Sequence, residues 1–378
     1  MEKIKIIGWD IGGANIKATK IIYNKKTTEL ESIKSSSSFF AMWNRNKNPL
    51  ELIESIYQNL GKVDYFAITM TAELADRFSS KIEGIIYFVN LFKNNYTQEK
   101  LYFYNNQAQA LNLDNKVIKN QNKNKNQDPV KEQKNFEKLM SLAAANWAVS
   151  AAFAAEFKED FVLFDLGSST IDLIPVKNKK IIALGSTDVQ RLETGELIYL
   201  GLLRTNLSNL VDKVPFQGKM IAVINEYFAS TADLHLLKGL IDTAAYSVSP
   251  ADNGEKTIKA AKARIARMIS LDLNLISDSE LMLIVDYIYE QEIGLIYNKL
   301  LQLFSRFSSD FNLPLLMNNK AALLKKDLEL RSKFSFQSLT ELIPLLENNI
   351  LTTTAAAFLL LKKIINQDLG ILMGLKDE

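Results

Sequence analysis

Two acidic residues open matched glycine-containing turns. Asp10 begins the turn Asp10-Ile11-Gly12-Gly13-Ala14-Asn15, and Asp165 begins Asp165-Leu166-Gly167-Ser168-Ser169-Thr170. Each turn follows an apolar, β-rich run and precedes another, which is the pattern of a hairpin. Because glycine lets the backbone approach a ligand closely, the N–H groups of such turns can bind phosphate oxygens. The two turns therefore predict a site for a phosphate or a diphosphate.

Side chains near the turns extend this prediction. Asp10 and Asp165 can hold Mg²⁺ directly or through water, and Lys17 adds a positive charge just past the first turn. The phosphate-binding residues that we expect are Gly12, Gly13, Asn15, Gly167, Ser168, Ser169 and Thr170. A single turn of this kind is as well explained by an ordinary polar hairpin. Two copies about one domain length apart favour a shared function.

The elements around the turns indicate a duplicated α/β domain. Apolar β-rich runs flank both turns, at 3–9, 16–23, 161–164 and 171–176, with further strands expected at 62–70 and 181–184. Helical patterns are expected at 136–157, 256–269, 277–304 and 352–365. We predict a first domain at 1–155, with a polar insertion at about 112–134. The second domain is expected at 156–378, with its C-terminal helix a candidate to return to the first, and with a cleft between the halves.

Composition narrows the class of protein. The chain has 378 residues, no cysteine, one histidine and a formal net charge of +2, so it offers no disulfide and no thiolate metal site. The near balance of charge gives no reason to expect nucleic acid. No run of about 18 apolar residues is present, and the N-terminus does not resemble a signal peptide. We expect a cytoplasmic protein without membrane partners, and the sequence leaves its oligomeric state open, a homo-oligomer included.

The motifs resemble a known superfamily and one branch of it. DIGGANIK and FDLGSSTIDL are similar to the two phosphate motifs of the superfamily that contains sugar kinases, acetate kinase and actin. The opening IIGWDIGGANIKAT resembles more closely the hydantoinase-like proteins of tetrahydromethanopterin-linked one-carbon pathways, among them the furan-methanamine synthases of methanofuran biosynthesis. Further segments fit this branch, at 69–78, 144–147, 194–205 and 225–237.

The resemblance implies a fold and a reaction. The fold is the actin-like ATPase fold, two ribonuclease H-like domains with a cleft between them. The reaction joins an aminomethyl-furan methyl diphosphate to γ-glutamyltyramine, with Mg²⁺ as cofactor, so that the phenol oxygen displaces diphosphate and forms an ether. Lys17 and Arg204 would neutralise the leaving group, because an arginine can chelate phosphate with two nitrogens. Asp172 is one candidate for the base that takes the phenol proton.

Two departures from the kinase pattern favour this branch. Sugar kinases with a similar turn usually carry threonine where this chain has Ala14, and ATP users of this fold tend to have a late glycine pair beside adenosine. No glycine stands between Gly294 and Gly370. Three alternatives remain open: an ATP-dependent small-molecule kinase, a hydantoinase-like ring-opening enzyme, and a non-catalytic nucleotide-binding regulator.

Other polar residues are candidates to bind substrate. They are Thr71, Glu73, Asp76, Glu196, Ser230, Thr231 and Asp233. Glu73 or Asp76 would anchor the aminomethyl cation, or would instead cap a helix, which is the commoner role. Glu196 and Arg204 would form a surface salt bridge if they had no ligand. His235 alone cannot build a metal site and is expected to pack or to face solvent, and Trp147 is expected in the core.

Overall fold

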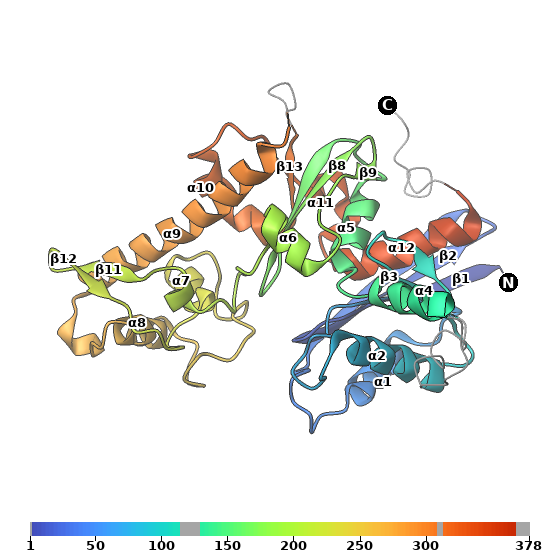
Figure 1. The fold of residues 1–378 in the computed structure, drawn as a ribbon, viewed down its shortest axis with the longest axis horizontal. Helices are drawn as coiled ribbons and strands as arrows, with labels where there is room; N and C mark the ends of the chain where they lie inside the picture. The colour runs from blue at the N-terminus through green and yellow to red at the C-terminus, as the bar shows by residue number, and fades with distance from the viewer. Residues whose placement is uncertain (1, 114–128, 308–312, 368–378) are drawn as a thin grey trace. The chain divides into compact units, whose positions relative to one another are not determined.

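The chain forms two compact units in the computed structural model, which describes residues 2–113, 129–307 and 313–367 (Figure 1). The first unit comprises the described residues of Met1–Asp160, Val176–Ile182 and Thr340–Glu378. The second comprises those of Phe161–Pro175 and Ala183–Leu339. The first unit is therefore built from three separate stretches of the chain.

The sheet of the first unit has the strand order β3-β2-β1-β4-β5-β6. Its strands are β1 (Lys3–Ile11), β2 (Asn15–Asn24), β3 (Glu29–Phe39), β4 (Tyr65–Met70), β5 (Lys100–Tyr104) and β6 (Ala110–Leu111). The first three are antiparallel neighbours, whereas β4 runs parallel to both β1 and β5. The first glycine turn is the bend between β1 and β2, at the end of β1 where the parallel strand β4 also ends.

The sheet of the second unit repeats this order as β10-β8-β7-β13-β14. Its strands are β7 (Phe161–Leu166), β8 (Ile171–Lys177), β10 (Leu197–Ile198), β13 (Leu315–Met317) and β14 (Phe336–Ser338), and the short β9 (Lys180–Ile181) pairs with β8 off this path. The strand β13 is parallel to β7 and to β14, as β4 is parallel to β1 and to β5. When β6 and β9 are left out and the other strands are counted along the chain, both sheets have the order 3-2-1-4-5. This duplicated ribonuclease H-like topology is that of the actin-like ATPase fold, as predicted, and the cleft stays a prediction.

Helices cover the sheet of the first unit. They are α1 (Pro49–Leu60), α2 (Lys81–Asn95), α4 (Pro129–Met140), α5 (Asn146–Ala154) and α12 (Leu351–Ile365). The helix α12 lies so close to β1 that an added Cβ at Gly8 would meet the carbonyl oxygen of Thr353 at 2.0 Å. The Thr353 hydroxyl also contacts that of Thr19 on β2 at 2.5 Å. Small side chains on both elements therefore fix the helix on the sheet, because larger ones would not fit.

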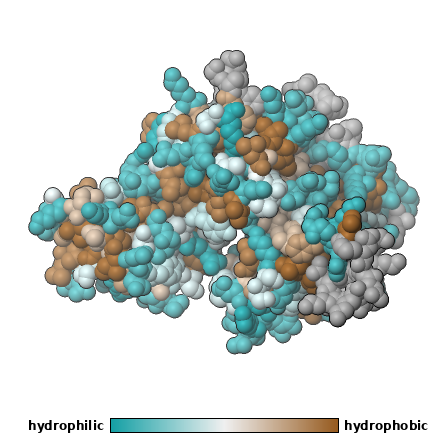
Figure 2. Space-filling model, viewed as in Figure 1, coloured by the Kyte–Doolittle hydropathy of each residue, from teal (hydrophilic) through white to brown (hydrophobic). Residues whose placement is uncertain are grey.

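The second unit adds a largely helical part to its sheet. Its elements there are α6 (Asp188–Thr194), the hairpin β11 (Lys213–Phe216) and β12 (Lys219–Ala222), α7 (Thr231–Leu237), α8 (Ile258–Arg267), α9 (Asp278–Phe304) and α10 (Lys325–Glu329). Ser277 starts α9 with a capping box to Glu280. Figure 2 shows hydrophobic residues at the end that carries the hairpin, where Met220 is 50% exposed.

Most elements expected from the sequence are confirmed, and three expectations change. The run at 136–157 is not one helix, because α4 and α5 are separated by a turn in which Ala144 has a φ of 46°. The strand expected at 181–184 is the short β9 (Lys180–Ile181). The polar insertion lies largely outside the described residues, and its last residues belong to α4. Within the described ranges, no helix is long and apolar enough to cross a membrane.

Candidate functional site

The first turn presents one buried acid and one basic side chain. The strand register places Asp10 opposite Lys17, and the Lys17 Nζ lies 2.9 Å from the Asp10 Oδ2. The turn is closed by a hydrogen bond of 3.0 Å from the Gly12 N–H to the Asn15 carbonyl. Asp10 is only 2% exposed. The hairpin thus pairs Lys17 with Asp10, a contact that the sequence analysis did not predict.

The second carboxylate oxygen of Asp10 is a suitable contact for a cation. The Asp10 Oδ1 is buried and has no hydrogen-bond partner among the described residues, which is costly unless a ligand supplies one. In the described part of the chain, no group of three or more acidic or histidine side chains could hold a metal by itself. Mg²⁺ commonly takes one or two carboxylates and completes its shell with water and substrate phosphates. The residues at this turn fit that mode of binding.

A loop after β3, which we call the first flanking loop (residues 40–43), orients the peptides of this turn. The Met42 N–H donates to the Gly13 carbonyl at 3.0 Å, and the Phe40 N–H donates to the Ala14 carbonyl at 3.1 Å. In a trans peptide the C=O and the N–H point in opposite directions. The loop therefore directs the N–H groups of Ala14 and Asn15 away from itself, as a phosphate-binding turn requires.

The segment after β4 lies beside the same turn. The Thr71 N–H donates to the Ile11 carbonyl at 2.9 Å, which continues the pairing of β1 with β4. Glu73 is 1% exposed and packs against the start of α2, where an added Cβ at Gly84 would meet its carbonyl at 2.5 Å. Asp76 is exposed. Neither acid caps α2, since Ser80 has that role, so the capping alternative is wrong.

The second turn is closed in the same way and is held from β13. The Gly167 N–H donates to the Thr170 carbonyl at 2.8 Å. The amide of Asn318, the residue directly after β13, donates from its Nδ2 to the Asp165 carboxylate and to the Leu166 carbonyl. Its Oδ1 accepts from the N–H groups of Leu166 and Ala321. Sequence reasoning missed Asn318, although its place after a parallel strand was a usable signal.

A second flanking loop (residues 201–204) lies against the second turn. The Leu202 N–H donates to the Gly167 carbonyl at 3.0 Å, while those of Leu203 and Arg204 donate to the Ser168 carbonyl at 3.1 and 3.0 Å. An added Cβ at Gly201 would meet the Ser169 nitrogen at 2.3 Å, so only glycine allows this approach. By the same peptide geometry, the N–H groups of Ser168 and Ser169 point away from the loop.

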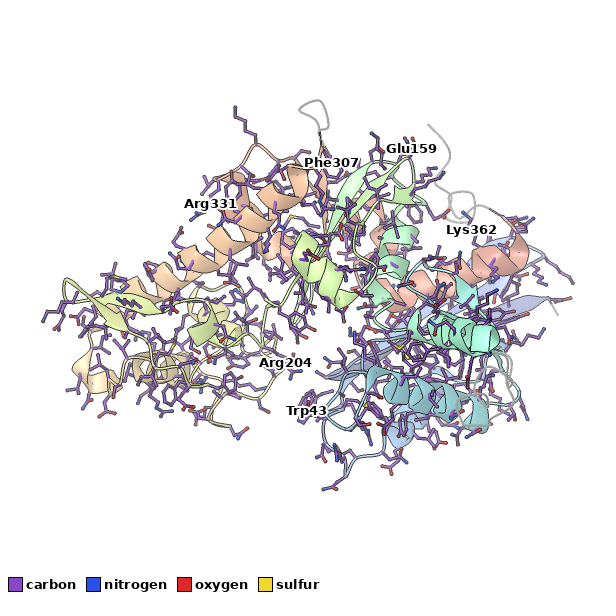
Figure 3. The ribbon with its side chains drawn as sticks, in the orientation of Figure 1. Trp43, Glu159, Arg204, Phe307, Arg331 and Lys362 are labelled. Atoms are coloured by element: carbon purple, nitrogen blue, oxygen red, sulfur yellow. The ribbon has the colours of Figure 1, made fainter. Side chains whose placement is uncertain are left out.

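Arg204 is thereby fixed beside the second turn by its own backbone. Burial lowers the pKa of its guanidinium, and the electrostatic interaction with Tyr227 acts in the opposite direction. A guanidinium keeps its proton under such conditions, so Arg204 stays a cation. The sequence predicted Arg204 as a site residue, and the structure bonds its backbone N–H to the Ser168 carbonyl. Figure 3 labels its side chain.

The start of α7 anchors the second flanking loop. The Thr231 hydroxyl donates to the Gly201 carbonyl at 2.7 Å and accepts from the Thr205 N–H at 3.2 Å. Asp233 is fully buried and accepts from the Ser230 N–H, from the Tyr246 hydroxyl at 2.9 Å and from the Arg264 Nε at 2.8 Å. Ser230, Thr231 and Asp233 are all fully buried. We therefore assign them to the support of the loop and not to contact with a substrate.

Two further acids also belong to the scaffold. Glu196 is fully buried, accepts from the N–H groups of Leu184 and Gly185, and forms an ion pair of 2.7 Å with Arg306. Asp172 forms an ion pair of 2.8 Å with the buried Arg191. Burial raises the pKa of Asp172, and Arg191 opposes this rise. Their carboxylates are bound to protein groups, so neither the substrate role of Glu196 nor the base role of Asp172 is supported.

The single histidine is part of this support. The His235 Nδ1 donates to the Leu202 carbonyl at 2.7 Å, and its Nε2 lies 2.9 Å from the Glu292 carboxylate. Burial lowers the pKa of His235, but Glu292 and the Leu202 carbonyl outweigh this and raise it above the ordinary value. His235 is fully buried and Trp147 is 4% exposed, so both pack inside the protein.

Comparison with known proteins identifies the family of the chain. Residues 130–285 match the family described as hydantoinase/oxoprolinase. Among solved structures, the activator of 2-hydroxyisocaproyl-CoA dehydratase from Clostridium difficile is 11% identical, with a TM-score of 0.40 over 96% of this chain and 97% of that one.

Two curated relatives carry one and the same name. They are the (4-{4-[2-(gamma-L-glutamylamino)ethyl]phenoxymethyl}furan-2-yl)methanamine synthases of Methanococcus vannielii and Methanocaldococcus jannaschii. The first is 37% identical over 33% of this chain and 57% of its own length. The second is 32% identical over 302 residues, which are 80% of each protein. At this identity and coverage, the chain belongs to the (4-{4-[2-(gamma-L-glutamylamino)ethyl]phenoxymethyl}furan-2-yl)methanamine synthase family.

Proposed function

We propose that the chain catalyses the condensation of an aminomethyl-furan methyl diphosphate with γ-glutamyltyramine. The phenol oxygen forms a bond to the furanylmethyl carbon as the bond from that carbon to the diphosphate oxygen breaks. The bonding electron pair leaves with the diphosphate, and the phenol proton passes to a base. The products are an aryl ether, which is the group named in the relatives, and diphosphate.

The observation that carries the proposal is the construction of the second turn. The segment that sets this branch apart from the wider superfamily, at 194–205, is the one whose backbone holds Gly167 and Ser168 and fixes Arg204 beside them. A positioned guanidinium can stabilise the negative charge that develops on a departing diphosphate. Since the leaving group carries the largest change of charge, this is where the protein can lower the barrier most.

The first turn supplies the second set of groups for the diphosphate. The N–H groups of Ala14 and Asn15 are oriented to donate, and Lys17 brings a positive charge that Asp10 holds in place. Asp10 and Asp165 are the residues that we propose to hold Mg²⁺, with the Asp10 Oδ1 as the clearest contact. When bound, Mg²⁺ would neutralise phosphate charge. The side chain at position 14 is a methyl group, so it cannot give a phosphate the hydroxyl contact that a threonine would.

The remaining task of the protein is to position the two substrates. The furan oxygen can delocalise positive charge at the methyl carbon as the diphosphate departs, so the reaction needs alignment more than a strong nucleophile. The chain carries no glycine between Gly294 and Gly370, in the late part of the sequence where ATP users of this fold tend to have a pair. The Asn318 side chain is bound to Asp165 and Leu166. This supports a diphosphate ester over ATP as the ligand.

The test is a reaction without ATP. The purified protein is incubated with Mg²⁺, the furan diphosphate and γ-glutamyltyramine, and ether and diphosphate are measured together by mass spectrometry and a coupled assay. Formation of both in equal amounts is expected. Strict dependence on ATP, or monophosphate as the product, would contradict the proposal and favour the kinase alternative.

A further inference from the structure

Two exposed aromatic side chains stand at the ends of the first flanking loop. Phe39 is the last residue of β3 and Trp43 closes the loop, and they are 53% and 40% exposed. Their ring centroids are 6.2 Å apart with an interplanar angle of 69°, an edge-to-face arrangement. Figure 3 labels Trp43 at the edge of its unit. We call these two residues the aromatic pair.

The backbone ties the aromatic pair to the first turn. Phe39 is the register partner of Asn15 in the pairing of β2 with β3. Met42, the neighbour of Trp43, donates to the Gly13 carbonyl at 3.0 Å. Phe39 is therefore held beside the turn by strand β3, and Trp43 follows a loop residue whose backbone is bonded to the turn.

The chemistry of the proposed substrate matches this arrangement. In a furan methyl diphosphate, one methylene group and one oxygen join the ring to the first phosphorus. A ring joined so closely to a phosphate that the turn binds must lie within a short distance of that turn. The aminomethyl group on the ring is a cation near neutral pH, and the face of an indole attracts cations.

We propose that the aromatic pair is the binding surface for the aminomethyl-furan ring, an inference that rests on the proposed function. Trp43 contacts the ring and its cationic substituent, and Phe39 holds the indole in place by its edge-to-face contact. The pair thereby selects diphosphate esters of cationic aromatic alcohols over inorganic diphosphate and over aliphatic diphosphates. The aromatic pair does not bind the phenol of γ-glutamyltyramine, which approaches the furanylmethyl carbon as the second substrate.

Kinetics provide the first test. Trp43→Leu removes the aromatic face and is expected to raise the KM for the furan diphosphate about five- to tenfold, since aromatic contacts of this kind contribute roughly 1 kcal/mol. The KM for γ-glutamyltyramine should stay unchanged, and Trp43→Phe should recover most of the loss. Phe136→Leu on α4, where the ring is also 40% exposed, is the matched control and should have no effect. An unchanged KM in Trp43→Leu, or a rise only for γ-glutamyltyramine, would overturn the inference.

Fluorescence provides a test that does not need turnover. The chain has three tryptophans, of which Trp9 is fully buried and Trp147 is 4% exposed, so quenching by acrylamide reports mainly on Trp43. The furan diphosphate should protect Trp43 from acrylamide, whereas inorganic diphosphate should not. Absence of ether with the wild-type protein would contradict the proposed function, and the quenching result would then still decide on the aromatic pair. Equal quenching with the two ligands would refute it.

Discussion

The two glycine turns have the same plan but are held by different means. In each, a following loop donates backbone N–H groups to the carbonyls of the turn, from residues 40 and 42 in the first and 202–204 in the second. The acid of the first turn pairs with Lys17 across its own hairpin, whereas that of the second is held by Asn318 from another strand. The first flanking loop carries the exposed Trp43, next to Phe39 of β3, and the second carries Arg204.

The differences between the two turns indicate that each has a different role. The first turn has a buried carboxylate oxygen for which the described part of the chain offers no hydrogen-bond partner, and an exposed aromatic pair lies beside it. These features suit a cation and the ring of a substrate. The second turn is fixed by a network of buried polar groups that ends at Arg204, which suits the stabilisation of charge on a leaving group. The two turns therefore share one backbone arrangement, and they differ in the side chains that surround them.

The largest effect is expected at Asp10. Asp10→Asn should lower kcat by about 10³-fold or more, because it removes the charge that we propose to hold Mg²⁺. Asp165→Asn should also inactivate the protein, but less completely, since its carboxylate already has the amide of Asn318 as a partner. The measurement is the rate of ether formation across a range of Mg²⁺ concentrations, with circular dichroism to show that the fold is intact. Near-normal activity of either variant in EDTA-treated buffer would contradict a metal site that uses both acids.

The next largest effect concerns the stability of the second unit. Asp233→Ala should lower the free energy of unfolding by about 3 kcal/mol, because it leaves the buried guanidinium of Arg264 without its main partner. Asp286→Ala is the control, since its pair with Lys238 lies on the surface, and it should change the free energy by about 0.5 kcal/mol or less. Urea denaturation measures both. Similar losses of unfolding free energy in the two variants would show that the buried pair of Asp233 and Arg264 stabilises the protein no more than a surface pair does.

Arg204→Ala tests whether Arg204 acts in the chemical step or in the binding of γ-glutamyltyramine. We expect kcat to fall about 10²-fold, which is typical for the loss of one group that stabilises a developing charge, while the KM for γ-glutamyltyramine changes little. Arg267→Ala removes an exposed arginine of the same unit and should leave the rate unchanged. Steady-state and single-turnover kinetics distinguish the two effects. A higher KM for γ-glutamyltyramine with an unchanged kcat would instead place Arg204 at the second substrate.

The sequence predicts local parts of this design better than distant ones. The two turns and their acids were predictable because strand, turn and strand are adjacent in the chain. The strand β3 was missed, since its serine-rich sequence has a weak β propensity and is held by pairing with β2. Asn318 lies 153 residues from Asp165 along the chain, and nothing local indicates their contact.

Two buried acids show a further case in which the sequence alone did not predict the role of a residue. Glu196 and Asp233 have the residue type and the neighbourhood of ligand-binding groups, but both are fully buried and bound to arginines. Burial is decided by tertiary packing, which one sequence does not reveal. The backbone of Arg204 lies beside the second turn, and its place and role in a site stay predictions.

The smallest expected effect is a dependence on pH that is confined to the second turn. Because Glu292 and the Leu202 carbonyl raise the pKa of His235 in the folded protein against the effect of burial, the folded state binds this proton more tightly than the unfolded state. Its stabilising contribution is therefore complete below about pH 6.5, the ordinary pKa of histidine, and is lost as the pH rises through the raised pKa.

His235 bonds directly to the second flanking loop. Hydrogen exchange, corrected for intrinsic rates, should show the amides of 202–204 losing protection as the pH rises, while those of 40 and 42 keep theirs. His235→Gln should remove the difference between the loops, and an equal response of both loops in the wild-type protein would show that the histidine does not couple the second turn to pH.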